Sequence, residues 1–286
     1  MSKIDWPENL IEEIAYRRSI LFLGSGVSAT AKNDDGNSPE TWGDFLQNIK
    51  SLITNPKQED MEYIDRMIDQ ENYLLALQAI YDLCDTGAYS KYLKDNFARG
   101  GFKPSLVHKA IKDIDSKIVI TTNFDKIYDN LCNQPQYVIY DYQKTKSIIS
   151  NIKSPENVII KAHGSIDDTD EIIFTAKQYF EKQQLFPDFY SLLKSLFQTY
   201  TVLFLGYSLS DPDINLVLQT IRNTSNAASP HYIVVKKGIS RHLMKHWEET
   251  YNIRCLEYGP DHEKFGENIE ELKNLVLGLR DERQIP

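Results

Sequence analysis

The sequence predicts an α/β protein: a Rossmann-like, doubly wound parallel sheet with a helical insertion between its first strands. Three observations predict it. Short β-branched runs alternate with helical patterns along most of the 286 residues. Glycine or small polar residues directly follow several of these runs. One long helical stretch separates the first two runs. Strands that alternate with helices form parallel sheets covered on both faces.

The expected strands are short runs rich in β-branched and aromatic residues. They cover residues 19–23, 117–121, 158–162, 201–205, 231–235 and 253–256. An apolar stripe that includes Leu10 and Ile14 predicts a helix before the first strand. A final amphipathic helix is expected over 263–279, with acidic residues at its start, as the helix dipole prefers.

The stretch 41–113 has helical periodicity almost throughout, which is far longer than the usual connection of about two to six residues between a strand and a helix. We therefore expect one domain over 1–286. Its Rossmann-like core comprises 1–40 and 114–286, and 41–113 forms a small helical subdomain. The polar segment 31–39 predicts a loop.

The composition of the chain argues against nucleic-acid binding, a metal site and a membrane span. The net charge is −9, and Lys and Arg alternate with Asp and Glu along the helical patterns, so no basic face for nucleic acid is expected. Three scattered cysteines lack the paired spacing of a zinc site, so we expect no metal. No run approaches the ~18–20 apolar residues of a membrane span. The first residues do not resemble a signal peptide, so we expect a cytoplasmic protein without membrane contact.

The first expected strand runs into Gly24-Ser25-Gly26-Val27-Ser28-Ala29, which matches the G-x-G-x-x-G/A pattern of dinucleotide-binding turns. In that pattern Gly24 permits the tight turn and Gly26 lets the backbone approach a pyrophosphate. Ser25 and Ser28 are candidate contacts to phosphate or ribose. An ordinary glycine turn is the alternative. The pattern also expects an acidic residue about twenty positions further along the sequence, where it would bind the ribose. The candidates near that position are Glu40 and Asp44.

Two further patches follow expected strands, at 121–125 (Thr-Thr-Asn-Phe-Asp) and at 160–165 (Ile-Lys-Ala-His-Gly-Ser). The amide of Asn123 and the imidazole of His163 are groups that position and activate water. Asn123 or Asp125 could instead simply cap the next helix, and His163 could be a structural histidine. A fourth patch after 201–205 offers Gly206 and Ser208 to a ligand.

In this order, the four motifs resemble the sirtuin family over nearly the whole chain. The resemblance implies an NAD site. Asn123 and His163 would be catalytic, with His163 as the base. The residues implied in binding NAD are Gly24, Ser25, Gly26, Ser28, Asp125, Gly206 and Ser208.

The chain departs from the protein-deacylating sirtuins, because their four-cysteine zinc site is absent and 38–42 reads Ser-Pro-Glu-Thr-Trp in place of Pro-Asp-Phe-Arg. These departures resemble the sirtuin-like effectors of bacterial antiphage systems, such as the Thoeris effector. We therefore expect an NAD hydrolase that depletes NAD during abortive infection. A separate sensor protein or self-association would control it. The alternatives are an NAD-dependent protein deacylase and a non-catalytic module that binds NAD or ADP-ribose.

Overall fold

The computed structural model describes residues 3–207, 215, 218 and 229–285. Within them, seven parallel strands form one sheet in the order β3-β4-β2-β1-β5-β6-β7. The strands are β1 Ser19–Leu23, β2 Ile118–Thr121, β3 Tyr137–Asp141, β4 Asn157–Lys161, β5 Thr201–Leu205, β6 His231–Lys236 and β7 Ile253–Tyr258. The predicted parallel α/β fold is confirmed, and the six predicted strands are present within a few residues of their expected bounds.

Strand β3 was not predicted from the sequence. It pairs with β4 alone, at the edge of the sheet, and its residues are half-buried or exposed. The predicted strands stood out because they are continuous buried runs, whereas an edge strand lacks that pattern. The β-branched and aromatic content of Tyr137-Val138-Ile139-Tyr140 was the available signal.

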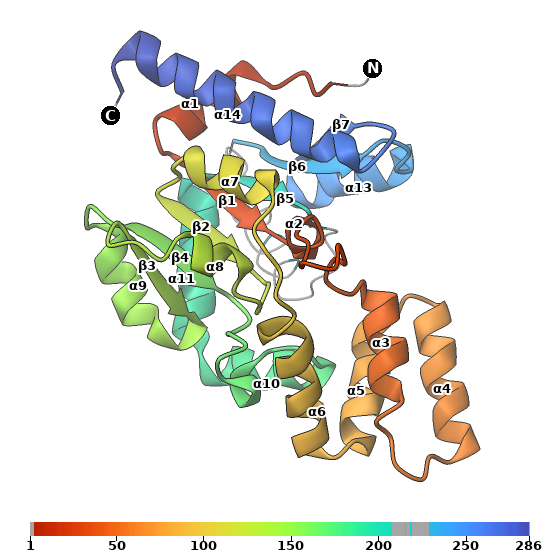
Figure 1. The fold of residues 1–286 in the computed structure, drawn as a ribbon. Coiled ribbons are helices and arrows are strands. Elements are labelled where there is room, and N and C mark those ends of the chain that lie inside the picture. The colour runs from red at the N-terminus through yellow and green to blue at the C-terminus, as the bar shows by residue number, and fades with distance from the viewer. Residues whose placement is uncertain (1–2, 208–214, 216–217, 219–228, 286) are drawn as a thin grey trace.

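Helices cover both faces of the sheet, so the fold is doubly wound (Figure 1). One face packs against α1 (Glu8–Ala15), α7 (Leu106–Asp113), α8 (Ile127–Leu131) and α14 (Glu263–Arg283). The other face packs against α9 (Thr145–Ile152), α10 (Ala176–Leu185), α11 (Pro187–Thr199) and α13 (Arg241–Tyr251). The buried strand residues alternate between the two clusters, as the two-residue period of a strand requires.

The inserted helices gather at one end of the molecule, beyond the sheet (Figure 1). They are α3 Trp42–Lys50, α4 Gln58–Asp69, α5 Tyr73–Leu83 and α6 Thr86–Leu93, followed by a π-helix at Lys94–Ala98. They build a hydrophobic cluster of their own, which also takes in Ile166, Ile172 and Phe174 from the segment after β4. Helix α7 packs instead with α14 on the sheet, although it lies within the predicted subdomain 41–113.

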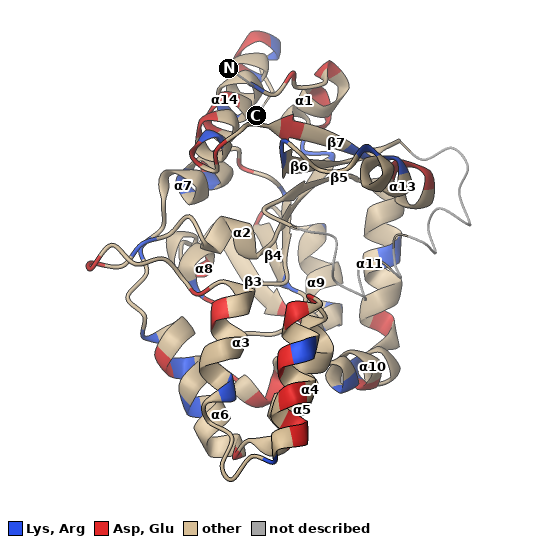
Figure 2. Cartoon of the chain, turned by 90° about the vertical axis from the view of Figure 1, so that its right-hand side faces the viewer, with Lys and Arg blue, Asp and Glu red and all other residues tan. Residues whose placement is uncertain are grey.

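Acidic side chains are frequent on α4, and blue and red segments are interspersed over most other helices (Figure 2). No helix among the described residues is both long enough and apolar enough to cross a membrane.

The chain changes direction across the sheet between β1 and β5. The connection from β1 leads to β2 on one side, whereas β5, β6 and β7 follow one another on the other side. In open α/β sheets the ends of such adjacent strands diverge into a crevice where ligands bind. The turns after β1 and β5 therefore lie at the predicted ligand-binding edge.

Candidate functional site

The turns after β1 and β5 are packed directly against each other. The amide of Gly24 donates a hydrogen bond to Leu205 O (2.9 Å), and the amide of Gly26 donates one to Gly206 O (2.9 Å). A Cβ on Gly24 would lie 2.4 Å from Gly206 O, and one on Gly26 would lie 2.9 Å from the same atom. This close backbone packing therefore requires glycine at both positions. Gly24 itself has an extended φ of −105°.

Gly206 is constrained in two ways. Its φ of +60° lies in the left-handed region that favours glycine, and a Cβ there would lie 2.4 Å from the amide nitrogen of Val27. Tyr207, the next residue, packs its ring against Phe22 with centroids 5.1 Å apart. Ser208, predicted as a ligand contact, lies outside the described residues.

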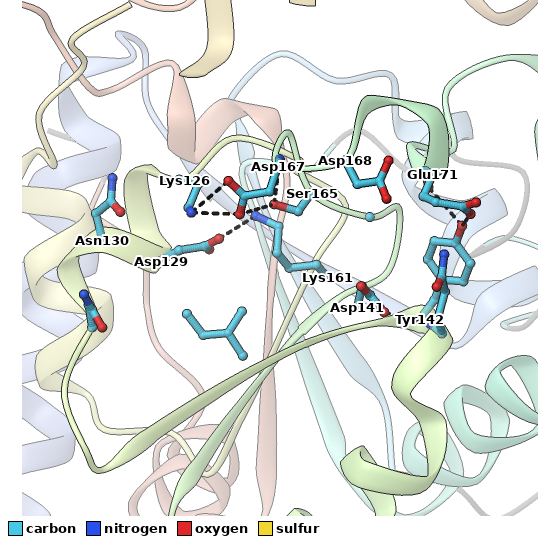
Figure 3. Close-up of a pocket in the computed structure, with 14 residues that line it drawn as sticks. Lys126, Asp129, Asn130, Asp141, Tyr142, Lys161, Ser165, Asp167, Asp168 and Glu171 are labelled. Carbon is cyan, nitrogen blue, oxygen red and sulfur yellow. Dashed lines mark hydrogen bonds and ion pairs between the residues drawn. The ribbon is translucent and has the colours of Figure 1, made fainter. Parts of the chain in front are cut away.

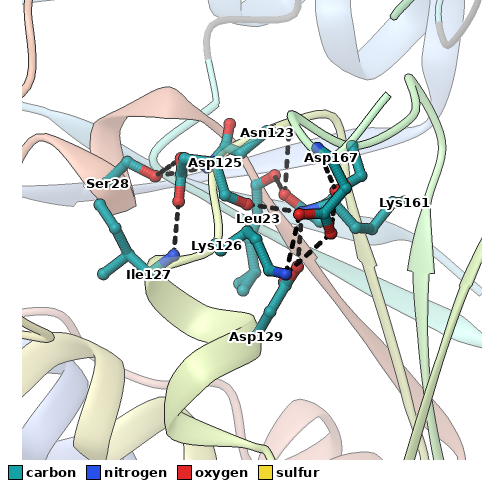
Figure 4. Close-up of polar contacts among 11 residues, drawn as sticks. Leu23, Ser28, Asn123, Asp125, Lys126, Ile127, Asp129, Lys161 and Asp167 are labelled. Atoms are coloured by element: carbon teal, nitrogen blue, oxygen red, sulfur yellow. Dashed lines mark hydrogen bonds and ion pairs between the residues drawn. The ribbon is translucent and has the colours of Figure 1, made fainter. Parts of the chain in front are cut away.

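Ser28 occupies the centre of a hydrogen-bond network between the β1 and β2 turns (Figure 4). It ends the single helical turn α2 (Ser25–Ser28) and is buried, whereas Ser25 is exposed. The Ser28 hydroxyl donates to Asp125 Oδ2 (2.6 Å) and accepts from Asn123 Nδ2 (2.9 Å). The structure thus brings Ser28, Asn123 and Asp125 together, as a shared site requires.

The Asn123 side chain is held by two hydrogen bonds. Its Nδ2 donates one to the Ser28 hydroxyl and one to Gly24 O (2.9 Å). Its backbone amide donates to Thr121 Oγ1 (3.0 Å), and Thr121 Oγ1 in turn donates to Leu23 O (3.0 Å). The amide therefore has one orientation, defined by the turn after β1. Nδ2 is committed to the protein, so the amide oxygen is the atom that remains for water or substrate.

Asp125 has two structural partners. Its Oδ2 accepts the hydrogen bond from Ser28, and its Oδ1 accepts one from the amide of Ile127 (2.9 Å), the first residue of α8. One carboxylate oxygen of Asp125 therefore caps α8, as the alternative interpretation expects, while the other oxygen takes part in the network with Ser28.

His163 lies just beyond the end of β4, with a side chain that is buried. Its Nδ1 lies 3.3 Å from the hydroxyl of Tyr179 on α10, and the two rings meet edge to face with centroids 5.0 Å apart. The β4 and β2 turns are joined by backbone hydrogen bonds from Ala162 to Thr121 (2.8 Å) and from Ile166 to Phe124 (2.8 Å). Asn123 and His163 therefore lie on adjacent strand ends that are tied to each other.

Phe124, next to Asn123, connects the site to the inserted helices. Its ring meets Phe97 of the π-helix at a centroid distance of 4.8 Å and Phe174 at 4.9 Å. Phe174 also packs on Trp42 at 4.9 Å. This chain of aromatic contacts makes the turn that carries Asn123 part of the wall of the helical cluster.

The two acidic residues considered for ribose belong to the insertion. Glu40 accepts hydrogen bonds from Tyr92 (3.0 Å) and Asn48 (2.8 Å). Asp44 accepts one from the Thr41 hydroxyl (2.7 Å) at the start of α3. Both carboxylates therefore stabilise the helical cluster.

Lys161 was not singled out in the sequence. It is the last residue of β4, and its side chain is only 2% exposed. Its ammonium donates to Asp125 O (2.5 Å) and to the buried Asp129 carboxylate (2.8 Å). A lysine at the end of an otherwise apolar strand was the signal that could have identified it, because lysines are rarely fully buried unless paired.

A cavity of about 390 Å³ lies beside this ion pair, on the β3 side of β4 (Figure 3). It is bordered by polar side chains, among them Lys126, Asp129, Tyr142, Lys161, Asp167 and Glu171. The cavity does not include Asn123, His163 or the glycine turns. We place the candidate site at the β1, β2, β4 and β5 ends because hydrogen bonds join the predicted residues there.

Among the residues that the structure describes, no group of three or more His, Cys, Asp or Glu side chains could hold a metal ion. The three cysteines, Cys84, Cys132 and Cys255, are unbridged.

Comparison with known proteins agrees with the motifs. Residues 117–256, which include Asn123, His163 and Gly206, match the family model described as SIR2-like domain. This segment of the chain is therefore similar to SIR2-like domains. A solved structure described as a SIR2 homolog–NAD complex covers 98% of this chain and 97% of its own, with 14% identity and a TM-score of 0.46.

Curated relatives match most of this chain at low identity. Defense-associated sirtuin 2 of Bacillus subtilis is 26% identical over 77% of this chain and 21% of its own length. NAD(+) hydrolase ThsA of Enterococcus faecium is 28% identical over 82% of this chain and 46% of its own length. NAD(+) hydrolase ThsA of Acinetobacter baumannii is 25% identical over 86% of this chain and 48% of its own length. The chain thus spans about half the length of these two ThsA relatives and about a fifth of the length of Defense-associated sirtuin 2.

Proposed function

We propose that this chain hydrolyses NAD at the nicotinamide N-glycosidic bond, releasing nicotinamide and ADP-ribose. The observation that carries the proposal is the hydrogen-bonded set of Ser28, Asn123 and Asp125, on turns tied by backbone to the segment of His163. The similarity to SIR2-like domains and the relatives named NAD(+) hydrolase support it.

The reaction needs a positioned water, a base and polar groups around the ribose. The glycosidic bond breaks through an oxocarbenium-like transition state, and nicotinamide leaves neutral with the bonding electron pair, so no strong acid is required. Water then forms the new C–O bond to the ribose carbon and loses one proton. In this proposal Asn123 positions the water and ribose, and His163 accepts the proton.

The remaining residues of the proposal bind NAD. The glycine turn of Gly24 and Gly26, with Ser25 and Ser28, holds phosphate and ribose. Asp125 holds the nicotinamide half, and Gly206 with Ser208 holds the adenosine half. The packing of the β1 turn on the β5 turn supports a single binding edge for both halves of the dinucleotide.

The biological role that we propose is NAD depletion in antiphage defence, in line with the name of the B. subtilis relative. Because uncontrolled NAD loss would kill the host cell, activity must be held in check. A separate sensor or regulatory protein that holds the active chain in check, or self-association that switches the chain on, would supply that control.

The proposal is tested by NAD turnover with the purified chain across a range of protein concentrations, with and without an acetyl-lysine peptide. His163→Ala should lower turnover by about 10²–10⁴-fold, the usual contribution of a base, and Asn123→Ala should cause a loss of similar size because the water and ribose are no longer positioned. Asn151→Ala and His242→Ala, outside the site, serve as matched controls and should retain wild-type rates. Circular dichroism verifies that each variant is folded.

Two results would replace the proposal. Turnover that appears only with acetyl-lysine peptide would identify a deacylase. NAD binding, seen by calorimetry, without cleavage at any protein concentration would identify a binding module. Equal rates for the wild type and His163→Ala would remove His163 as the base.

A further inference from the structure

Lys161 links the two segments that carry Asn123 and His163. Its backbone ends β4, two residues before His163, and its ammonium reaches across to the carbonyl oxygen of Asp125, two residues after Asn123 (Figure 4). The 2.5 Å contact with Asp125 O and the 2.8 Å contact with Asp129 are both buried. This side chain therefore adds a buried link between the two turns, beside the backbone hydrogen bonds that also join them.

Stability alone does not explain this arrangement. Taking two charges out of water costs about as much as their attraction returns, and well-packed apolar side chains usually serve at least as well. Burial raises the pKa of Asp129, an effect that the neighbouring ammonium of Lys161 only partly offsets. A buried lysine in this position consequently calls for a role beyond holding the fold together.

The contact with the Asp125 carbonyl supplies such a role. The same residue uses both oxygens of its side chain, one for Ser28 and one for the start of α8. A shift of the Asp125 backbone would therefore move its carboxylate away from Ser28, and Ser28 is also the acceptor for the Asn123 amide. Lys161 thus acts on the orientation of Asn123 through Asp125 and Ser28.

We propose that Lys161 is a positioning residue for the reaction at this site: its ammonium fixes the Asn123–Asp125 turn relative to His163. The proposal rests on the proposed hydrolysis of NAD. It assigns Lys161 no contact with substrate, and Asp129 is the group that neutralises the buried charge.

Lys126 provides a matched comparison close by. It lies in the same region, and its ammonium pairs with Asp167 at 2.7 Å, but the two side chains are 38% and 63% exposed, at the rim of the cavity in Figure 3. Exposed ion pairs contribute little to stability. Lys126→Met removes the same kind of charge without touching the Asp125 carbonyl, so it should leave turnover unchanged.

The decisive comparison is between Lys161→Met and the double variant Lys161→Met with Asp129→Leu. The single variant leaves Asp129 buried and unpaired, and its thermal midpoint should fall by about 10 °C. The double variant removes both charges, so its midpoint should return most of the way to the wild-type value. Its kcat should nevertheless remain about 10- to 100-fold low, with KM within about threefold, because the turn is no longer held.

Asp129→Asn adds a second comparison that keeps Lys161 and its contact with Asp125 O. It should retain kcat within about threefold despite a lower midpoint. If the double variant regains kcat together with stability, Lys161 is structural and the proposal is wrong. The proposal is also wrong if Asp129→Asn loses as much kcat as Lys161→Met.

Hydrogen exchange separates this proposal from the proposed function. In the double variant the amides of Asn123, Phe124 and Ile127 should exchange at least about tenfold faster than in the wild type, whereas amides of β6 should not change. A wild type that releases no nicotinamide would refute the hydrolase, and the exchange data would still decide whether Lys161 holds the turn. Unchanged exchange at all three amides would refute the positioning role.

Discussion

Ser28 donates a 2.6 Å hydrogen bond to Asp125, although the two residues are 97 positions apart in the sequence and the whole helical insertion lies between them. The same hydroxyl accepts a hydrogen bond from Asn123. Two turns at adjacent strand ends therefore share one polar centre, and the geometry of each depends on the other.

Ser28→Ala should weaken this centre without changing the fold. Asp125 and Asn123 would each lose one partner, and we expect kcat/KM for NAD to fall about 10- to 100-fold. Steady-state kinetics with Ser195→Ala, an exposed serine on α11, as the control would measure it. Wild-type kinetics for Ser28→Ala would show that the network is not needed for the reaction.

Gly206→Ala should destabilise the whole domain. The new Cβ would meet the backbone of the β1 turn at 2.4 Å and would force alanine into a positive φ. Strain and overpacking of this kind cost about 2–4 kcal/mol in the free energy of unfolding. Gly43→Ala in α3, where nothing lies within 4 Å of the Cβ, should be neutral or stabilise by up to about 1 kcal/mol. Equal urea midpoints for the two variants would contradict the close packing of the turns.

Tyr179→Phe should lower kcat through His163 alone. The Tyr179 hydroxyl lies 3.3 Å from His163 Nδ1, so it helps to fix the orientation of the imidazole that we propose as the base. Removing the hydroxyl should reduce kcat about 3- to 30-fold and leave KM unchanged. Adding the change to His163→Ala should cause no further loss. Additive losses in this double-mutant cycle would show that Tyr179 acts independently of His163.

His231 should make stability depend on pH. Burial lowers its pKa to about 4, and its Nδ1 accepts the backbone N–H of Val202 at 3.1 Å. Between pH 6.5 and 4 the unfolded chain therefore binds a proton that the folded chain does not. The free energy of unfolding should therefore decrease as the pH drops from 6.5 to 4, and His231 should account for about 3 kcal/mol of this decrease.

His231→Asn retains an acceptor for Val202 and removes the titrating ring. The loss of unfolding free energy between pH 7.5 and 5 should therefore be smaller in this variant than in the wild type. His242→Asn, on an exposed face of α13, is the control and should keep the wild-type slope. Parallel slopes for all three proteins would mean that His231 titrates normally.

The sequence allowed much of the fold to be predicted, because buried parallel strands are continuous apolar runs. The runs around Leu21, Val119 and Leu203 are of this kind, and all three residues are buried in the sheet. The half-exposed edge strand β3 lacks this pattern and escaped prediction. The packing of Phe174 into the helical cluster escaped it too, because this contact joins segments that no local period connects.

The sequence allowed the residue types of the candidate site to be proposed, but not the contacts between them. Small polar side chains after strands pointed to Asn123, Asp125 and His163. Nothing local indicated that Ser28 joins two of them, or that Gly206 packs on the β1 turn, because both depend on the order of strands in the sheet. The contacts of Lys161 could not be predicted for the same reason, since its partners lie in the turn after β2 and in α8.

The most direct test of the central proposal is proton NMR of NAD incubated with the purified chain and no peptide. Free nicotinamide and ADP-ribose should appear together, one of each for every NAD consumed, and Asn123→Ala should lower the release of both by about 10²–10⁴-fold. Intact NAD at every protein concentration, or nicotinamide released only when an acetyl-lysine peptide is added, would contradict it.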